Sequence, residues 1–440
     1  MKLFDYDDAD VVLKHPRHMR TLGVVAELIG RLRQCDRPGD YVAFQSDLLK
    51  HLLEVEEHRA GFSQVVKRMG NGLGPQAGAP ELEGGGDTRY IETWKLERDV
   101  CERAARQLRS VGDALAWRSF DYQRQFILAL CRNELAGPLA NKAGLVAERA
   151  AVERVWKEDR RFAILHDLTT CLRIGDITVF GEDKVWIREI KTNPRRHSRA
   201  QLDRIQAAIQ ALWQHKVLPG GDPRARLLAL DTPYAAHLDL LRLALGQANE
   251  QGLFGVKLSG RRALLVTDLY GIEKQGYNEA EYFERFERRR RATLRRARAD
   301  DAMGLHVIGL SLDNTARDPR HVPWGCYPLD PMTCARIIGD FAIVHVEMSG
   351  PAVAEELRSA GINARWVLPP GPQSFASHPV AMHIDHGTTT LEVNRLEIDR
   401  YLMEMLEFET WANGIKELLV GQPIHGRPWP YYKGEHLAWA

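Results

Sequence analysis

The chain has 440 residues, of which 44% are hydrophobic and 27% are charged, and its formal net charge at pH 7 is +1. This length exceeds what one small core needs, so we expect two or three domains. The composition is that of a globular protein. The balanced charge excludes a protein that is basic over its whole surface, so any contact with nucleic acid must come from a local basic patch.

Six scattered cysteines form no Cys-x-x-Cys pair, which argues against a zinc cluster and a disulfide framework and favours a reducing compartment. The acidic N-terminus, Met1–Asp8, lacks the apolar segment of a signal peptide. No apolar run reaches the roughly 18–20 residues of a membrane span. We therefore expect a cytoplasmic protein with no membrane partner.

Helical patterns open the chain. Apolar residues recur at helical spacing up to about residue 69, and the Gly/Pro-rich residues 70–86 predict a linker or a long surface loop. Further on, residues 144–158 predict a helix, Phe162–Leu165 a strand and Ser198–His215 a second helix.

The second half of the chain mixes helices and strands. Phe254–Leu258 and Ala263–Leu269 predict a hairpin, Glu281–Arg298 an arginine-rich helix and Arg395–Leu419 one long helix. The expected fold class is α/β (α+β), with helices packed around a mixed sheet. The expected domains are a helical N-terminal region (1–87), a central domain (88–280, with its motif core at 142–215) and a C-terminal α/β domain (281–440).

Two apolar β-type runs, Arg173–Phe180 and Val185–Thr192, flank a polar turn. Strand alternation places Glu189 and Lys191 on one face, and a hairpin brings Asp176 beside Glu189. Two close carboxylates repel each other unless a cation lies between them, and oxygen ligands suit Mg²⁺ or Mn²⁺. Such a metal polarises a phosphodiester and acidifies a bound water, which Lys191 can orient. The alternative is a surface hairpin with a cross-strand ion pair.

Glu182-Asp183-Lys184 is a second group of acids and a lysine that could be mistaken for the metal-binding motif. We discard it because it lies in the polar turn, where nothing holds two ligands rigidly. Glu148 is a better third acid, because it lies on the apolar stripe of its predicted helix. A carboxylate that faces a core needs a partner. That partner is either a buried arginine or the proposed site, whereas Glu153 lies off the stripe and is expected to be solvated.

Residues 191–226 contain eight Lys or Arg and two acids. This basic segment can neutralise phosphates beside the site, or it can be a solvated helix face. His166 and Asp167 end a strand near the proposed site, and a turn role is the simpler interpretation of Asp167.

Together, Lys142–Glu148, Gly175-Asp176 and Glu189-Ile190-Lys191 resemble the motifs of the PD-(D/E)xK nuclease superfamily, which includes restriction-endonuclease-like and RecB-type nucleases. The resemblance covers residues 142–215. It departs from the pattern at Gly175, where many members have proline.

The resemblance implies a core helix, a mixed sheet, a second helix and Mg²⁺-dependent hydrolysis of DNA. It implies that Asp176, Glu189 and the Ile190 carbonyl lie at the metal, that Glu148 completes the site, and that Lys191 lies beside the attacking water.

RecB-type relatives carry a glutamine on the following helix, where this chain has Gln201. Ser198 and Gln201 equally fit a helix capping box. The basic residues expected at the DNA backbone are Arg195, Arg196, His197 and Arg199.

We therefore expect a metal-dependent deoxyribonuclease of restriction, repair or phage defence, with the terminal regions serving recognition, homo-oligomer formation or binding of a partner protein. The alternatives are a non-catalytic nucleic-acid-binding or scaffold protein on the same fold, and an RNA-directed nuclease.

Two further features stay open. His378, His383, Asp385 and His386 can ligate a transition metal, although a solvated or core-satisfied histidine loop is the preferred interpretation. The arginines of residues 288–298 can follow a nucleic-acid backbone or belong to an exposed, ion-paired helix.

Overall fold

The computed structural model describes residues 9–132, 136–140, 142–181, 184–190, 199–214, 235–299, 307–311, 318–367 and 380–420. The chain forms two compact units. Unit 1 comprises residues 1–120, 124–227 and 323–339, and unit 2 comprises residues 121–123, 228–322 and 340–440. Unit 1 thus holds the predicted N-terminal helical region together with the motif core, and most of unit 2 begins at residue 228 rather than at 281.

The described residues confirm the mixed α/β class, with fourteen α-helices and three small sheets. The expected mixed sheet is not found among them, because every described strand pairing is antiparallel. The pairs β2–β3 (residues 177–188), β4–β5 (residues 253–268) and β9–β10 (residues 380–394) are hairpins joined by short turns, which favours antiparallel pairing.

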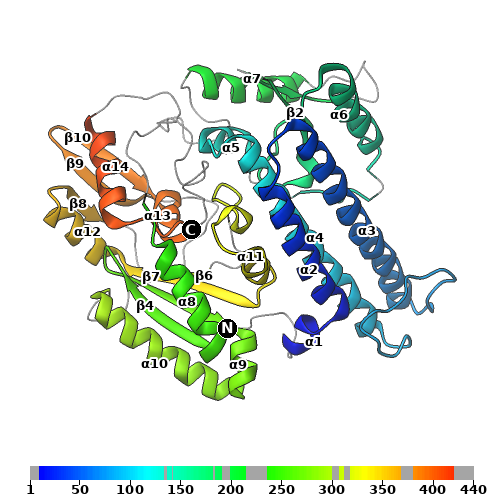
Figure 1. Cartoon of the computed structure of the whole chain (residues 1–440), viewed down its shortest axis with the longest axis horizontal. Coiled ribbons are helices and arrows are strands. Elements are labelled where there is room, and N and C mark those ends of the chain that lie inside the picture. Colours follow the sequence, from blue (N-terminus) through cyan, green and yellow to red (C-terminus); the bar gives the residue numbers. More distant parts are fainter. Residues whose placement is uncertain are drawn as a thin grey trace. The chain divides into compact units, whose positions relative to one another are not determined.

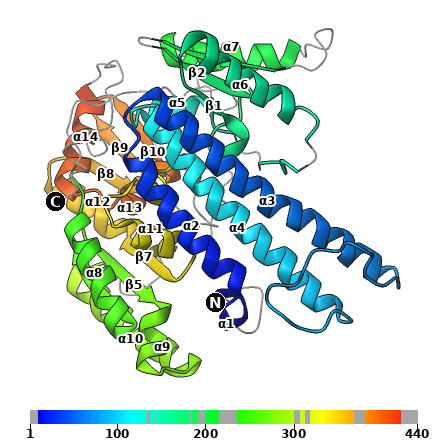
Figure 2. The same ribbon diagram turned by 45° about the vertical axis from the view of Figure 1, so that its right-hand side comes forward.

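Helices dominate unit 1. They are α1 (Ala9–Leu13), α2 (Pro16–Arg33), α3 (Pro38–Gly70), α4 (Ile91–Ser119), α5 (Arg124–Leu130), α6 (Leu145–Asp159), α7 (Arg199–Gln214) and α11 (Pro331–Ile338). The long helices α2, α3 and α4 lie side by side (Figures 1 and 2). Both α2 and α3 begin with proline, whose fixed φ suits the first turn and whose missing N–H is not needed there.

The centre of α4 is buried on all sides, from Ala104 to Trp117, apart from the exposed Arg106. A helix that other elements cover all round can use small and apolar residues on every face. The predicted Gly/Pro-rich connection begins at the last residue of α3, Gly70, and its residues 71–86 form an irregular loop between α3 and α4 that contains no helix or strand.

Unit 1 also contains a three-stranded sheet in the order β1-β2-β3. Its strands are β1 (Ala163–Leu165), β2 (Ile177–Phe180) and β3 (Val185–Arg188), and the short 3₁₀ helix η1 (His166–Leu168) follows β1. The predicted hairpin is confirmed: β2 pairs with β3 from Ile177↔Arg188 to Phe180↔Val185.

A late segment of the chain completes unit 1. Residues 323–339 contain the 3₁₀ helix η2 (Trp324–Cys326) and α11, which packs against α2. The Arg33 guanidinium of α2 donates to the carbonyl oxygens of Leu329 at 2.6 Å and Tyr327 at 2.8 Å. Trp324 and Tyr327 are buried, so this segment is part of the core of unit 1.

Unit 2 contains a four-stranded sheet in the order β4-β5-β7-β6 and a three-stranded sheet in the order β10-β9-β8. Its strands are β4 (Leu253–Leu258), β5 (Arg262–Asp268), β6 (Val307–Ser311), β7 (Ala342–Ser349), β8 (Asn363–Trp366), β9 (Val380–His386) and β10 (Thr389–Asn394). Its helices are α8 (Leu238–Gln251), α9 (Leu269–Gln275), α10 (Glu279–Ala297), α12 (Gly350–Ser359), α13 (Arg395–Met403) and α14 (Phe408–Val420).

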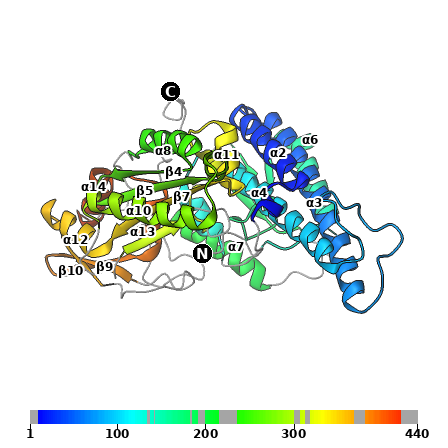
Figure 3. The same cartoon turned by 90° about the horizontal axis from the view of Figure 1, so that it is seen from below.

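Helices cover both faces of the larger sheet. Figure 3 shows α8 on one side of β4 and β5 and α10 on the other. Every residue of β5 is buried, as expected for a strand with both faces covered. The predicted hairpin of β4 and β5 is confirmed, with Leu258 opposite Arg262.

The prediction of one helix over Arg395–Leu419 is wrong, because the chain breaks between α13 and α14. Met405 has a φ of 48°, in the left-handed region, which no helix interior tolerates. The break frees backbone groups at Leu406, which forms a bridge with Ala236. The buried Arg262 donates to the carbonyl oxygens of Leu406 and Tyr401, and its guanidinium lies 3.7 Å from the Tyr401 ring centroid.

None of the described helices combines the length and the apolar character that a membrane crossing requires.

Candidate functional site

The β2–β3 hairpin brings the two predicted strand acids together. The β2–β3 pairing ends at Ile177↔Arg188, and Asp176 and Glu189 are the next residues beyond this last pair, one on each strand. The Asp176 amide donates to the Arg188 carbonyl at 2.9 Å, and the Ile190 amide donates to Asp176 Oδ2 at 2.6 Å. The carboxylate of Asp176 thus holds the backbone at Ile190, whose carbonyl is a predicted metal ligand.

Gly175 lies where the motif that the sequence resembles often has proline. Its φ is +81°, in the left-handed region, whereas a proline ring fixes φ near about −65°. A Cβ at this position would lie 2.6 Å from Ile187 Cγ2 on β3. Only glycine satisfies both conditions, so the turn into Asp176 is built on a different local geometry.

Glu148 lies where the helical stripe predicts. It is in the first turn of α6, which buries Leu145, Glu148, Val152 and Val155 on one face. Its side chain is 3% exposed. Glu153, predicted to be solvated, is 59% exposed and has only a long pair to Lys157.

The partner of Glu148 is a lysine rather than an arginine. Lys142 Nζ lies 2.8 Å from Glu148 Oε1 and also pairs with Asp167 Oδ2, so one ammonium bridges two carboxylates. Asp167 therefore faces the site from η1, in addition to its place in a turn.

Burial raises the pKa of Glu148 to about 7, and the negative charges of Asp167 and Asp176 act in the same direction, while Lys142 opposes them. Asp167 and Asp176 thus both lie near enough to Glu148 for their negative charges to act on it. The helix, the 3₁₀ turn and the hairpin contribute one acid each.

A neutral histidine ties η1 to the hairpin. His166 Nδ1 lies 2.9 Å from the Gly175 carbonyl, which can only accept, so this nitrogen carries the proton. The opposite nitrogen, Nε2, then accepts from the Thr178 hydroxyl at 2.8 Å. Burial lowers the pKa of His166 to about 3, so the ring stays neutral and keeps this tautomer.

Side chains of α3 and α4 hold the loops that carry the site. Arg109 of α4 and Glu56 of α3 form a buried pair at 2.6 Å. Arg109 also donates to the carbonyls of Gly137 and Asp167, and Glu56 accepts from the amides of residues 139 and 140. This pair therefore fixes both the loop that leads to Lys142 and the backbone of Asp167.

Two further buried side chains support the sheet. The Asp113 carboxylate accepts from the Cys171 amide at 3.0 Å, from the Thr170 amide and from the Thr170 hydroxyl. The Gln45 amide of α3 donates to the Ala163 carbonyl at 2.9 Å and accepts from the Leu165 amide at 2.8 Å. Gln45 thus pairs with β1 as a neighbouring strand would.

Several predicted site residues lie outside the described residues, namely Lys191, Arg195, Arg196 and His197. Arg199 and Gln201 begin α7, where Arg199 is exposed and Gln201 is half-buried. Ser198 is not described, so the capping alternative for Gln201 stays a prediction.

Helical spacing in the sequence predicts one apolar stripe on α7, formed by Leu202, Ile205, Ile209 and Leu212, and this prediction is partly wrong. Ile205 is buried, together with Ala208, but Leu202 is 48% and Ile209 38% exposed. The buried line of the helix runs through Ile205 and Ala208, three residues apart, rather than through the larger side chains on either side.

The histidine cluster lies on the β9–β10 hairpin rather than in a loop, with His378 outside the described residues. His383 Nδ1 pairs with Arg365 at 3.1 Å, and Asp385 accepts from Thr390 at 2.7 Å. Across the described residues, no three His, Cys, Asp or Glu side chains are grouped closely enough to hold a metal ion.

Sequence reasoning missed Lys142 as the partner of Glu148, and it also missed Gln45, Glu56, Arg109 and Asp113. A signal existed for the four on α3 and α4, since each is a polar residue among the apolar positions of a long helix, and such residues need partners.

No family model, curated protein or solved structure matches this chain.

Proposed function

We propose that the chain is a metal-dependent nuclease that hydrolyses DNA phosphodiester bonds on a restriction-endonuclease-like core in unit 1. The observation that carries this proposal is that Asp176 and Glu189 directly follow the last β2–β3 pair, Ile177↔Arg188, while the Asp176 carboxylate accepts from the Ile190 amide. The buried Glu148 of α6 lies near enough to Asp176 for the negative charge of Asp176 to act on it.

The donor set fits a hard divalent cation. Carboxylate oxygens and a backbone carbonyl are ligands that Mg²⁺ and Mn²⁺ prefer. The negative charges of Asp167 and Asp176 oppose ionisation of Glu148, and a divalent cation would relieve that repulsion. Asp176, Glu189 and the Ile190 carbonyl would hold the metal, with Glu148 beside them. When bound, the metal would supply Lewis-acid activation of the phosphodiester and of a water molecule.

The chain's own residues would have three tasks. Asp176 fixes the backbone at Ile190 through its hydrogen bond to the amide. Lys142 neutralises Glu148 and Asp167 before substrate binds. Lys191 would orient the attacking water, and the basic residues from Arg195 to Arg199 would contact the phosphates of the DNA backbone.

The test is cleavage of supercoiled plasmid, linear duplex, single-stranded DNA and RNA, with Mg²⁺, with Mn²⁺ and with EDTA. We expect cleavage of a DNA substrate that EDTA abolishes. Asp176→Asn, Glu189→Gln and Lys191→Ala should each reduce the rate at least about 100-fold.

The matched control changes Glu182-Asp183-Lys184, a second sequence of two acids and a lysine between β2 and β3. A Glu182→Gln/Asp183→Asn/Lys184→Ala variant removes the same residue types and should cleave at the rate of the unchanged protein. Mg²⁺ titration by calorimetry gives a readout that does not depend on turnover, and Asp176→Asn should weaken it. Equal cleavage by the site variants and the control variant contradicts the assignment of the site. Cleavage of RNA alone would show that the substrate is RNA rather than DNA.

A further inference from the structure

The C-terminal half of α10 in unit 2 has an unusual distribution of charge. Residues 288–298 contain seven arginines and no acid, although the whole chain has a net charge of only +1. The four glutamates of α10 all precede residue 288. Acids at the N-terminus and cations at the C-terminus of a helix complement its dipole, but the dipole amounts to about half a charge at each end. Seven guanidinium groups exceed that need.

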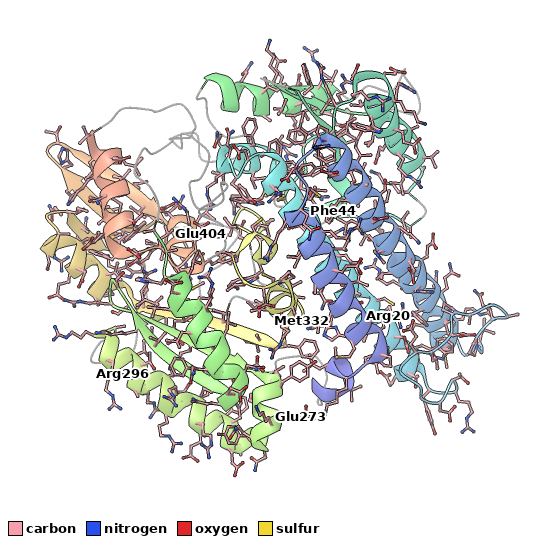
Figure 4. All side chains as sticks on the ribbon, viewed as in Figure 1. Arg20, Phe44, Glu273, Arg296, Met332 and Glu404 are labelled. Atoms are coloured by element: carbon pink, nitrogen blue, oxygen red, sulfur yellow. The ribbon has the colours of Figure 1, made fainter. Side chains whose placement is uncertain are left out.

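The inner face of α10 accounts for two of the seven arginines. Thr293, Leu294 and Ala297 are buried, and α10 packs against β4 and β5. Arg290 Nε donates to both carboxylate oxygens of Glu347 on β7 at 2.8 Å. Arg296 donates to the Gly255 carbonyl at 3.2 Å, and Figure 4 labels it near the C-terminal end of the helix. These contacts fix the orientation of α10 on the sheet.

The outer face carries a stripe of exposed arginines. Arg288, Arg291 and Arg295 follow at three- and four-residue spacing, so they lie on one face over about 10 Å of helix, and Arg298 is the C-cap. The side chains of Arg288 and Arg291 are 66% and 73% exposed. We call Arg288, Arg291, Arg295 and Arg298 the arginine stripe.

The stripe is largely uncompensated. Arg288 and Arg291 have only long pairs, at 3.8 Å to Glu284 and 3.6 Å to Glu287, and exposed pairs of this kind contribute little. Within the part of the chain that the structure describes, neither Arg295 nor Arg298 forms an ion pair. Ordering like charges on one face is unfavourable in the free protein, so a polyanion that binds there gains from relieving it.

We propose that the arginine stripe of α10 is a second nucleic-acid contact, which binds the phosphate backbone of duplex DNA. Guanidinium groups present paired donors that match phosphate oxygens. Duplex DNA carries one negative charge per roughly 1.7 Å of its axis, so the length of the stripe faces several phosphates. The contact is independent of sequence, because it reaches phosphates rather than base edges.

Other polyanions fit the stripe less well. A membrane-surface helix needs apolar side chains beside its basic ones, and between residues 288 and 298 the apolar Leu294 and Ala297 are buried. A protein partner needs aromatic or apolar anchors at the centre of the interface, and this half of α10 exposes none.

The test measures binding of a short fluorescein-labelled duplex by the full chain in EDTA, so that it does not depend on cleavage. Anisotropy titrations between about 50 and 200 mM salt give the affinity and its salt slope. The test variant is Arg288→Gln/Arg291→Gln/Arg295→Gln. The control is Arg242→Gln/Lys274→Gln/Lys416→Gln, which removes the same charge from α8, α9 and α14.

We expect the test variant to bind at least about tenfold more weakly at low salt and its salt slope to fall by about 3, as for three lost phosphate contacts. The control variant should keep both values. Circular dichroism should show both variants folded, since the substituted side chains are exposed or, for Arg242, half-buried on the helix surface.

Equal losses in the two variants overturn the proposal, as does an unchanged slope in the test variant. Preferential loss of binding to anionic lipid vesicles, with duplex binding unaffected, assigns the stripe to a membrane instead. If Asp176→Asn abolishes cleavage but not duplex binding, the proposal for the arginine stripe still holds. The nuclease proposal and the stripe proposal can therefore be refuted independently.

Discussion

Lys142 Nζ lies 2.8 Å from Glu148 Oε1, and this lysine is the cation that neutralises a glutamate with a 3% exposed side chain. Removing one member of a buried pair leaves the other charge without compensation, which costs about 3–5 kcal/mol. Partial exposure of Lys142 reduces that figure, so we expect Lys142→Met to lower the free energy of unfolding by about 2–3 kcal/mol.

The comparison that isolates this pair is the double variant Lys142→Met/Glu148→Gln, which should recover more than half of the loss in urea unfolding. Lys157→Met is the control, because its partner Glu153 is exposed and the change should cost less than about 0.5 kcal/mol. If the double variant is as unstable as the sum of the single ones, Lys142 does not act through Glu148.

Gly175 gives a second prediction. Gly175→Ala places a Cβ 2.6 Å from Ile187 Cγ2 at a residue with φ of +81°, so it should destabilise the chain by about 1–3 kcal/mol. Gly175→Pro introduces the residue that the sequence resemblance would lead one to expect, yet it should be more damaging than Gly175→Ala, because the proline ring cannot adopt this φ. Gly74→Ala is the control, since nothing lies within 4 Å of its Cβ position. Thermal unfolding that ranks Gly175→Pro as the mildest change would contradict the turn geometry.

Gln45 gives a third prediction. Gln45→Leu keeps the size of the side chain but leaves the Ala163 carbonyl and the Leu165 amide without their partner, which should cost about 2–3 kcal/mol. Hydrogen exchange should report this locally, because the Leu165 amide loses its protection. Gln64→Leu is the matched control, since its one contact, to Gln76, is exposed. An unchanged exchange rate at Leu165 would show that another group protects it.

The fourth prediction concerns pH. Burial lowers the pKa of His18 from 6.5 to about 4, and Arg103 and His15 act in the same direction. The unfolded chain therefore binds a proton between pH 6.5 and 4 that the folded chain does not, so stability falls as the pH falls through this window. The lowered pKa of His18 corresponds to a loss of about 3 kcal/mol in the free energy of unfolding once the pH has fallen below about 4.

His18→Gln removes the titration and should flatten the pH dependence of the free energy of unfolding between pH 6.5 and 4. Other buried histidines titrate in the same window, so the readout is the difference from the unchanged chain rather than complete loss of the slope. Two parallel curves would exclude His18 as a contributor.

The sequence predicted the parts of the site that depend on local periodicity. Alternation identified the β2–β3 hairpin, and helical spacing identified the buried face of α6 with Glu148. Both patterns arise from residues within a few positions of each other, where backbone geometry alone decides which side chains share a face.

The remaining parts depend on contacts between distant segments. Lys142 meets Asp167 across 25 residues, and Gln45 meets Leu165 across 120. No spacing rule connects such positions. The break at Met405 was missed for the same reason, since Arg262, from 144 residues earlier in the chain, binds the carbonyl that the break frees at Leu406.

The discontinuity of unit 1 sets an order of events during synthesis. Arg33 and α2 leave the ribosome early, but Tyr327, Leu329 and α11, which they bind, are made about 300 residues later. Until then the apolar face of α2 that α11 covers stays exposed, and exposed apolar surface on a nascent chain is prone to aggregate. Fragments that end before residue 339 should accordingly depend on chaperones and accumulate poorly in the soluble fraction.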